Sequence, residues 1–106
     1  MRQINHPKLD QIELTDIMYA LSDPARLEIV RFLACGKKAL TCSELNCDRP
    51  KSSMSHHFKI LRESGLLETR IEGKEHFNSL RLSELETKFP GVLKNILKVL
   101  QNGKVT

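Results

Sequence analysis

The chain is 106 residues long, carries a net charge of +4 and contains three cysteines, which allows one domain, residues 1–106, with a modest core. No apolar run approaches the roughly 20 residues that cross a bilayer, and the first residues lack the layout of a signal peptide. An odd number of cysteines does not suggest a secreted disulfide framework, so we expect a cytoplasmic protein with reduced thiols and no membrane partner.

The first third of the chain predicts two helices after a loosely held start. Residues 1–8 are polar and contain a proline, and we expect little structure in them. Apolar side chains recur mostly every three or four positions over residues 9–21, which predicts an amphipathic helix. Asp23 is a natural N-cap and Pro24 a natural first helical residue, so a second helix should begin there and end near Gly36.

A short helix, a longer helix and a hairpin should follow. We expect the third helix at about residues 43–47 and the fourth at about residues 52–64, separated by Pro50 because proline cannot lie inside a helix. The remaining elements are two strands at residues 66–71 and 75–82, joined by a turn in which a glycine supplies a positive φ.

Residues 83–101 predict a helix in two pieces. Ser83 and Glu86 match a capping box at its start, and Pro90 with its following glycine should break it. The second piece carries an apolar stripe with no obvious cover within the chain, made by Val92, Leu93, Ile96, Leu97 and Leu100. We therefore expect this stripe to pack in a two-fold interface against the first helix of either subunit.

The predicted fourth helix has an apolar face and a face of small and basic side chains. Met54, Phe58 and Leu61 fall at i, i+4 and i+7, so they should face inward. Hydroxyl groups near a helix N-terminus let the backbone approach phosphates, whereas serine and histidine can read base edges. Basic charge gathers here, because residues 49–81 contain seven Lys/Arg and four Asp/Glu. With the cations near the hairpin tip, the candidate DNA-contacting residues are Arg49, Lys51, Ser52, Ser53, Ser55, His56, His57, Lys59, Arg62, Arg70 and Lys74.

Two motifs resemble the signatures of a known family. Residues 20–29, Ala-Leu-Ser-Asp-Pro-Ala-Arg-Leu-Glu-Ile, and residues 52–66, which contain Ser-His-His-Phe-Lys-Ile-Leu, are similar to motifs of ArsR-type winged-helix repressors. The resemblance implies an α+β, mostly helical winged helix-turn-helix fold of four helices, a β-hairpin and a fifth helix. It also implies a homodimer held by residues 9–21 and 83–101. Such a dimer binds double-stranded DNA at an inverted-repeat operator, represses transcription and responds to a chemical signal.

The resemblance also bears on metal sensing. Metal sensors of this family often place a Cys-x-Cys pair at the start of the third helix, where this chain has Thr41 and Ser43. Others use ligands in the last helix, but residues 83–101 contain no histidine, cysteine or aspartate. His56 and His57 are adjacent and should point to different faces, so the three or four converging donors of a zinc site are not evident. We expect no metal and no cofactor, and an atypical metal site is the alternative.

Three thiols, those of Cys35, Cys42 and Cys47, are then the available chemistry for a signal. The redox sensors of the family pair a cysteine of the second helix with one of the last helix, which has none here. A disulfide would need Cys42 with Cys47, Cys35 with Cys42, or a bridge between subunits, and the sequence does not choose among these. Control by oxidation is one interpretation, and structural or incidental thiols are the other.

No catalytic site is expected in this chain. The sequence has no glycine-rich phosphate loop, no nucleophile elbow and no paired carboxylates in an apolar setting. The predicted function is therefore that of a DNA-binding, dimeric repressor and not of an enzyme. A winged helix used for protein interaction is the alternative from another class, and it would bind DNA without a steep dependence on salt.

Overall fold

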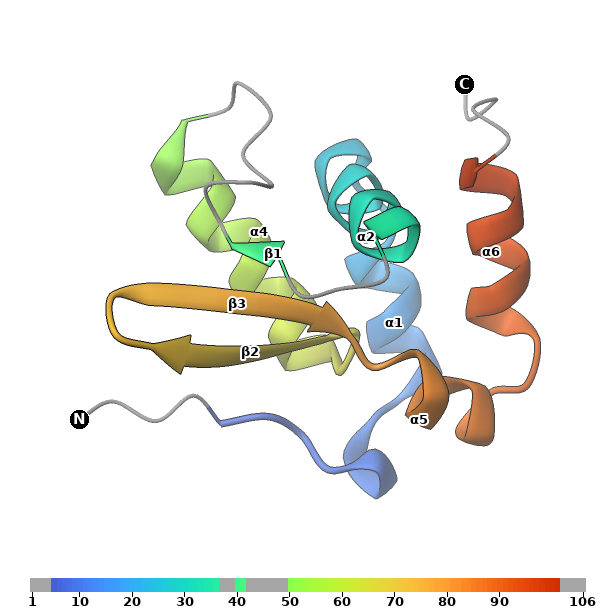
Figure 1. The fold of residues 1–106 in the computed structure, drawn as a ribbon. Helices are drawn as coiled ribbons and strands as arrows, with labels where there is room; N and C mark the ends of the chain where they lie inside the picture. Colours follow the sequence, from blue (N-terminus) through green and yellow to red (C-terminus); the bar gives the residue numbers. More distant parts are fainter. Residues whose placement is uncertain (1–4, 37–39, 42–49, 102–106) are drawn as a thin grey trace.

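The computed structural model describes residues 5–36, 40–41 and 50–101. Within these ranges helices surround one end of a three-stranded sheet, whose other end projects as a hairpin (Figure 1). The elements, labelled as in Figure 1, are a 3₁₀ turn at Leu9–Gln11, α1 (Leu14–Ala20), α2 (Pro24–Gly36), β1 (Leu40–Thr41), α4 (Lys51–Ser64), β2 (Leu67–Glu72), β3 (Glu75–Leu80), α5 (Leu82–Lys88) and α6 (Val92–Gln101). No helix in these ranges is long and apolar enough to cross a bilayer.

The single helix predicted at residues 9–21 is wrong, because the chain is extended at Ile12 and Glu13. The apolar spacing continues through this break, so periodicity alone does not reveal it. The extended backbone directs the side chain of Ile12 into the core, where only 2% of the residue is exposed. Burial of this side chain favours the break over a continuous helix.

The predicted start of α2 is confirmed. The carboxylate Oδ1 of Asp23 accepts hydrogen bonds from the backbone N–H groups of Ala25, at 2.8 Å, and Arg26, at 3.4 Å. Pro24 is the first helical residue, where the absence of a backbone N–H costs nothing. Asp23 therefore accepts hydrogen bonds from two of the N–H groups that have no partner within the helix at its N-terminus.

The sheet has the order β1-β3-β2 and is antiparallel. The hairpin turns at Gly73, which has φ +62, and Glu72 pairs with Glu75 beside it. The predicted strands are confirmed, but β3 ends at Leu80 instead of residue 82. The two-residue β1 was not predicted, and it places Thr41 in a strand. The third helix predicted at residues 43–47 lies outside the described residues.

The predicted break between the last two helices is confirmed, whereas the predicted capping box is wrong. α5 begins at Leu82, and its N-cap residue makes no side-chain cap hydrogen bond. The carboxylate of Glu86 instead accepts hydrogen bonds from the backbone N–H groups of Gly91 and Lys94, each at 3.1 Å. This carboxylate joins the end of α5 to the first turn of α6 and satisfies free N–H groups there.

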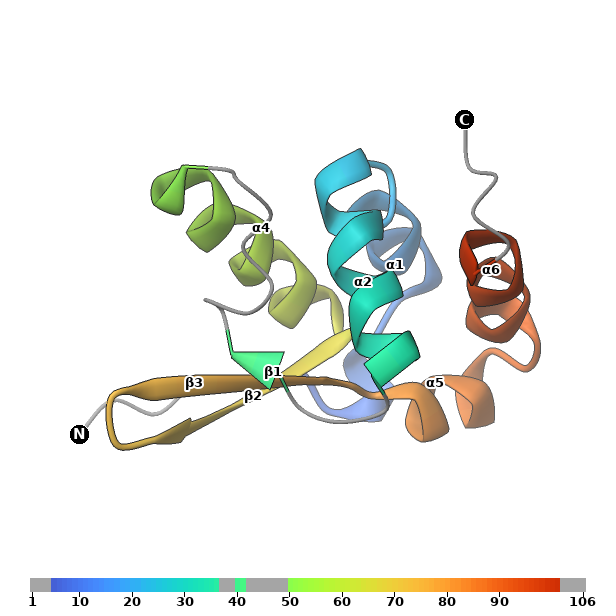
Figure 2. The ribbon, with the colours of Figure 1, turned by 45° about the horizontal axis from the view of Figure 1, so that its top comes forward.

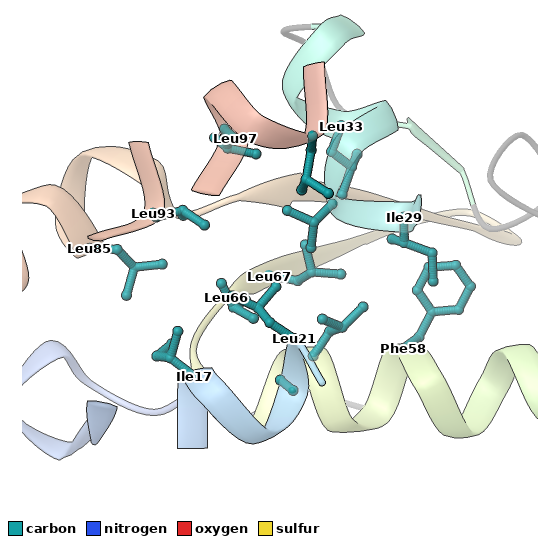
Figure 3. Packing of buried hydrophobic residues seen from close by; sticks show 14 of the residues in the cluster. Ile17, Leu21, Ile29, Leu33, Phe58, Leu66, Leu67, Leu85, Leu93 and Leu97 are labelled. Carbon is teal, nitrogen blue, oxygen red and sulfur yellow. The ribbon is translucent and has the colours of Figure 1, made fainter. Parts of the chain in front are cut away.

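Apolar side chains from α1, α2, α4, α5, α6 and β2 meet in one core (Figure 3). Leu93, Leu97 and Leu100 of α6 are at most 6% exposed within a single chain. This corrects the expectation that their stripe requires a partner subunit, because α6 packs on α2 and α5 of its own chain. Val92 and Ile96 are the partly buried members of the stripe.

The beginning of the chain is held more closely than its composition predicts. The ring Nε2 of His6 accepts a hydrogen bond from the backbone N–H of Thr69 at 2.9 Å, on the edge of β2. The guanidinium of Arg81 donates to the carbonyl of Pro7 at 2.8 Å. Lys88 donates to the carbonyl of Ile12 at 2.6 Å. Residues 6–12 therefore lie along β2 and α5, and the expectation of little structure in residues 1–8 is wrong for this part.

Candidate nucleic-acid interface

Helix α4 is fixed by its apolar face and by its end. Met54, Phe58 and Leu61 are 4%, 3% and 0% exposed, as their spacing predicts. Gly65 ends the helix in the left-handed region, with φ +94, which favours glycine. The chain then turns directly into Leu66 and β2, so the orientation of the helix and that of the hairpin are linked.

The opposite face of α4 carries most of the predicted DNA-contacting side chains. Lys59 is exposed, and Arg62 is half-buried near the end of the helix. The other exposed members, toward its N-terminus, are Ser52, Ser53, Ser55 and His56. Lys51 is the first helical residue, but its side chain and the whole of Arg49 lie outside what the structure describes. The result is a polar face of small side chains with a cation one turn further along.

The hairpin supplies a second group of predicted contacts. Lys74 is exposed in the turn, next to Gly73. Arg70 is also exposed, but its guanidinium forms an ion pair with Glu72 and lies 5.7 Å from the ring centroid of Phe77. In both views the N-terminal end of α4 and the turn of the hairpin point to the same side of the molecule (Figures 1 and 2). Lys74 is therefore the basic side chain placed furthest along that side of the hairpin.

His57 is placed differently from its neighbours on α4. Its side chain is 14% exposed, and its Nε2 lies 4.0 Å from Oδ1 of Asp23. Its Nδ1 lies 3.1 Å from Nη1 of Arg26. His56, by contrast, is exposed. The two adjacent histidines thus face different surroundings, as their spacing predicts, and the ring of His57 is engaged within the protein.

Arg26 is a structural part of this site to which the sequence patterns assign no role. It is 5% exposed, and its Nε donates to the carbonyl of Ala20 at 2.7 Å. Its guanidinium carbon lies 5.4 Å from the ring centroid of Tyr19. A buried arginine needs such partners, because an unpaired buried charge is costly. The sequence shows an arginine in the first turn of a helix that begins with Asp-Pro. It does not show the contact of this arginine with His57, which lies 31 positions further along the chain.

The charge of Asp23 follows from its surroundings. Burial alone would raise the pKa of its carboxyl group. Hydrogen bonds from the backbone N–H groups of Ala25 and Arg26, together with the charges of Arg26 and of the protonated form of His57, outweigh burial and leave the pKa below its usual value. Asp23 is therefore an anion at neutral pH, positioned between α2 and the ring of His57.

The candidate thiols are only partly placed. Cys35 is exposed near the end of α2 and is a free thiol. Cys42 and Cys47 lie outside the described residues, as does Ser43. In the described ranges no three His, Cys, Asp or Glu side chains come together as metal ligands would.

Comparisons with known proteins agree with this geometry. A family model described as a helix-turn-helix domain matches residues 21–70. YceK of Bacillus subtilis, an uncharacterized HTH-type transcriptional regulator, is 42% identical over 89 residues, which are 82% of this chain and 88% of that protein. The arsenical resistance operon repressor of Staphylococcus aureus is 34% identical over 74 residues, 70% of this chain and 71% of that protein.

Solved structures share the fold. Reduced HlyU from Vibrio cholerae superposes with a TM-score of 0.67 at 23% identity, over 87% of this chain and 88% of that chain. At this level of identity the likeness concerns the fold alone. It confirms the predicted α+β, mostly helical winged helix-turn-helix fold, in which α4 is the predicted fourth helix and the β2–β3 hairpin is the wing.

Proposed function

The chain belongs to the ArsR family of helix-turn-helix transcriptional regulators, and from this premise we propose that it is a dimeric repressor that binds an inverted-repeat operator with α4 and the wing. The observation that carries this proposal is the solvent-exposed polar face of α4, on a helix whose N-terminal end points to the same side of the molecule as the wing turn (Figure 2). A helix face of this kind fits the major groove, and an exposed lysine in a hairpin turn can reach phosphates or the adjacent minor groove.

Roles within the interface follow from side-chain chemistry and exposure. Ser55 and His56 are exposed on the outer face and are suited to base edges. Lys59 on α4 and Lys74 on the wing are suited to phosphates, which set affinity but not sequence preference. The flanking contributors are Arg49, Lys51, Ser52, Ser53, Arg62 and Arg70. Arg70 contributes less charge than a free arginine would, because Glu72 is its ion-pair partner.

The surface for dimerisation is the outer side of α1 and α6. With the leucines of α6 covered by their own chain, the exposed large apolar side chains of these two helices are Leu14 at 38%, Met18 at 48%, Tyr19 at 61% and Val99 at 56% exposed. Helix α6 lies on the opposite side of the molecule from the wing turn (Figure 1). A second copy could therefore cover this surface and leave both recognition helices open to DNA, and the symmetry of a dimer matches that of an inverted repeat.

For the signal, we favour thiol chemistry over metal binding. Cys35 is an exposed thiol, and no metal-ligand group is present in the described ranges. Serine replacement of each of Cys35, Cys42 and Cys47, with operator binding measured in reducing and oxidising buffer, tests this directly. Stoichiometric zinc in the purified protein, together with indifference to oxidant, would contradict it.

The experiment that tests the main proposal is a salt titration of DNA binding. The operator is first isolated by selection from random duplexes with the purified protein. We expect the logarithm of the operator affinity to fall linearly with the logarithm of salt concentration, because phosphate contacts release counterions. A random duplex is the control, and it should bind more weakly at every salt concentration.

Weak binding without a salt slope, or equal affinity for both duplexes, would contradict the proposal and favour a protein-interaction module. A regulator with DNA as its partner works in the compartment that holds the DNA, which is the cytoplasmic placement expected from the sequence. We assign it no catalytic activity of its own.

A further inference from the structure

One buried guanidinium joins three helices in this fold. Arg26 belongs to α2, and its Nε and Nη2 donate to the last carbonyls of α1, those of Ala20 at 2.7 Å and Tyr19 at 3.4 Å. Its Nη1 reaches His57 on α4 at 3.1 Å. The last carbonyls of a helix lack intrahelical donors, so a cation is stabilised there; the carbonyl of Tyr19 also accepts from the backbone N–H of Ser22 at 3.0 Å and from its hydroxyl at 2.6 Å. These hydrogen bonds to α1 hold the guanidinium in place independently of its contact with α4.

The protonation of His57 follows from this contact. A guanidinium can only donate hydrogen bonds, so Nδ1 of His57 must be the acceptor and carries no proton. In the neutral ring the proton is then on Nε2, which faces Oδ1 of Asp23 at 4.0 Å. Asp23 is itself fixed by the backbone N–H groups that it caps. One ring on the recognition helix therefore lies between a fixed donor and a fixed anion.

We propose that His57 is a positioning residue for operator binding, which accepts a hydrogen bond from Arg26 and so fixes α4 at its working angle against α1 and α2. This rests on the proposed function. The side chain is 14% exposed and comes from the same helix as the exposed Ser55 and His56. A shift of α4 therefore moves the base-reading side chains as a group, and small displacements of positioned groups have large effects on complementarity.

Two substitutions of His57 separate positioning from a direct DNA contact. In H57N the amide oxygen can occupy the position of Nδ1, so an acceptor for the hydrogen bond from Arg26 is kept. In H57Q the side-chain oxygen lies one bond further out, near the place of Nε2, and that acceptor is lost. Helix propensity favours glutamine over asparagine, so a simple stability effect would run in the opposite direction.

We expect H57N to keep operator affinity within about twofold of the wild type and H57Q to lose about 10-fold. Affinity for a random duplex should be nearly the same in all three proteins. His56 is the matched control, because H56N and H56Q should both weaken operator binding to a similar degree. Thermal unfolding of each variant establishes that it is folded.

A second readout does not depend on DNA. Long-range ¹⁵N correlation spectra of the free protein at neutral pH should show His57 with its proton on Nε2 and an unprotonated Nδ1. A proton on Nδ1 would overturn the proposal.

Equal losses in H57N and H57Q would also overturn it and would favour a direct contact of His57 with the bases. A loss in H57N alone would overturn it as well, because that pattern is the one expected from helix propensity. Failure of the wild type to bind the selected operator in a salt-dependent way would instead overturn the proposed function. In that case the ¹⁵N spectra of the free protein would still show whether Nδ1 of His57 accepts the hydrogen bond from Arg26.

Discussion

The side chain of Ile12 occupies the space in which a side chain at Gly65 would lie. A Cβ atom built on Gly65 would be 2.4 Å from Cδ1 of Ile12 and 2.6 Å from its Cγ1. Gly65 also has φ +94, where residues other than glycine are strained. The segment before α1 is thus packed directly on the junction between the recognition helix and the wing.

Gly65→Ala should therefore destabilise the protein strongly. We expect a loss of about 3 kcal/mol in the free energy of unfolding, from overpacking and backbone strain together. Gly73→Ala is the matched control, because Gly73 also has a positive φ but no atom lies within 4 Å of the added Cβ. It should cost only about 1 kcal/mol. Equal losses in urea denaturation would contradict the contact with Ile12.

Substitutions on the DNA face should separate sequence reading from phosphate binding. Ser55→Ala and His56→Ala should each reduce the discrimination between operator and random DNA by about 1–3 kcal/mol, because each removes a base contact. Lys59→Ala and Lys74→Ala should weaken both kinds of binding alike and make the salt dependence shallower. Unchanged operator affinity in all four variants would exclude α4 and the wing from the interface.

Stability and assembly should respond to different helices. Leu97 is 6% exposed within one chain, so Leu97→Ala should cost about 2–5 kcal/mol of folding stability, because it leaves a cavity in the core.

Met18 is 48% exposed on α1, and Met18→Glu should weaken dimerisation while leaving the fold of the subunit intact. Sedimentation at several concentrations, with circular dichroism, separates the two effects. A wild-type protein that stays monomeric at micromolar concentration would contradict the dimer.

Acid should weaken the attachment of the N-terminal segment to β2. Burial, as the largest effect, lowers the pKa of His6 below 6.5; Glu68 opposes this, while Arg81 and Arg62 add to it. The folded state thus binds a proton less readily than the unfolded state. The contribution of His6 to stability is complete above pH 6.5 and is lost as pH falls from there through the lowered folded value.

His6→Gln gives the comparison for this effect, because glutamine can accept the hydrogen bond from Thr69 but does not titrate. Unfolding free energies of both proteins, measured from about pH 7.5 to about pH 5, should diverge as the pH falls, with the wild type losing more. Parallel curves would show that His6 does not titrate differently in the folded and unfolded states.

The parts of the fold that the sequence predicts are those with local causes. Met54, Phe58 and Leu61 define the inner face of α4 by spacing alone, and Asp23 with Pro24 defines the start of α2. The break at Ile12 escapes such reasoning because a contact 53 positions away, at Gly65, favours it. The spacing of apolar residues predicts that a segment has an apolar face, but it does not predict which part of the protein packs on that face.

The same distinction applies to α6 and to the candidate site. The sequence predicts the apolar stripe of α6, but the helices that cover it are α2 and α5 of the same chain. The exposed residues of α4 could be listed from helix geometry, since exposure on one face follows from the burial of the other. The engagement of His57 could not, because it depends on how α1 and α2 present Arg26 to α4. Contacts of this kind are set by tertiary packing and leave no local pattern.

The hydrogen bond from Thr69 to His6 has a consequence for association between molecules. β2 is an outer strand of its sheet, and an outer strand with free N–H groups is a template on which another chain can add a strand. His6 occupies one of these groups with a side chain instead of a strand, so another strand cannot hydrogen-bond to the N–H of Thr69 while His6 holds it. Protonation of His6 would uncover that donor, and at acidic pH the edge of the wing becomes the place where aggregation of the folded protein should begin.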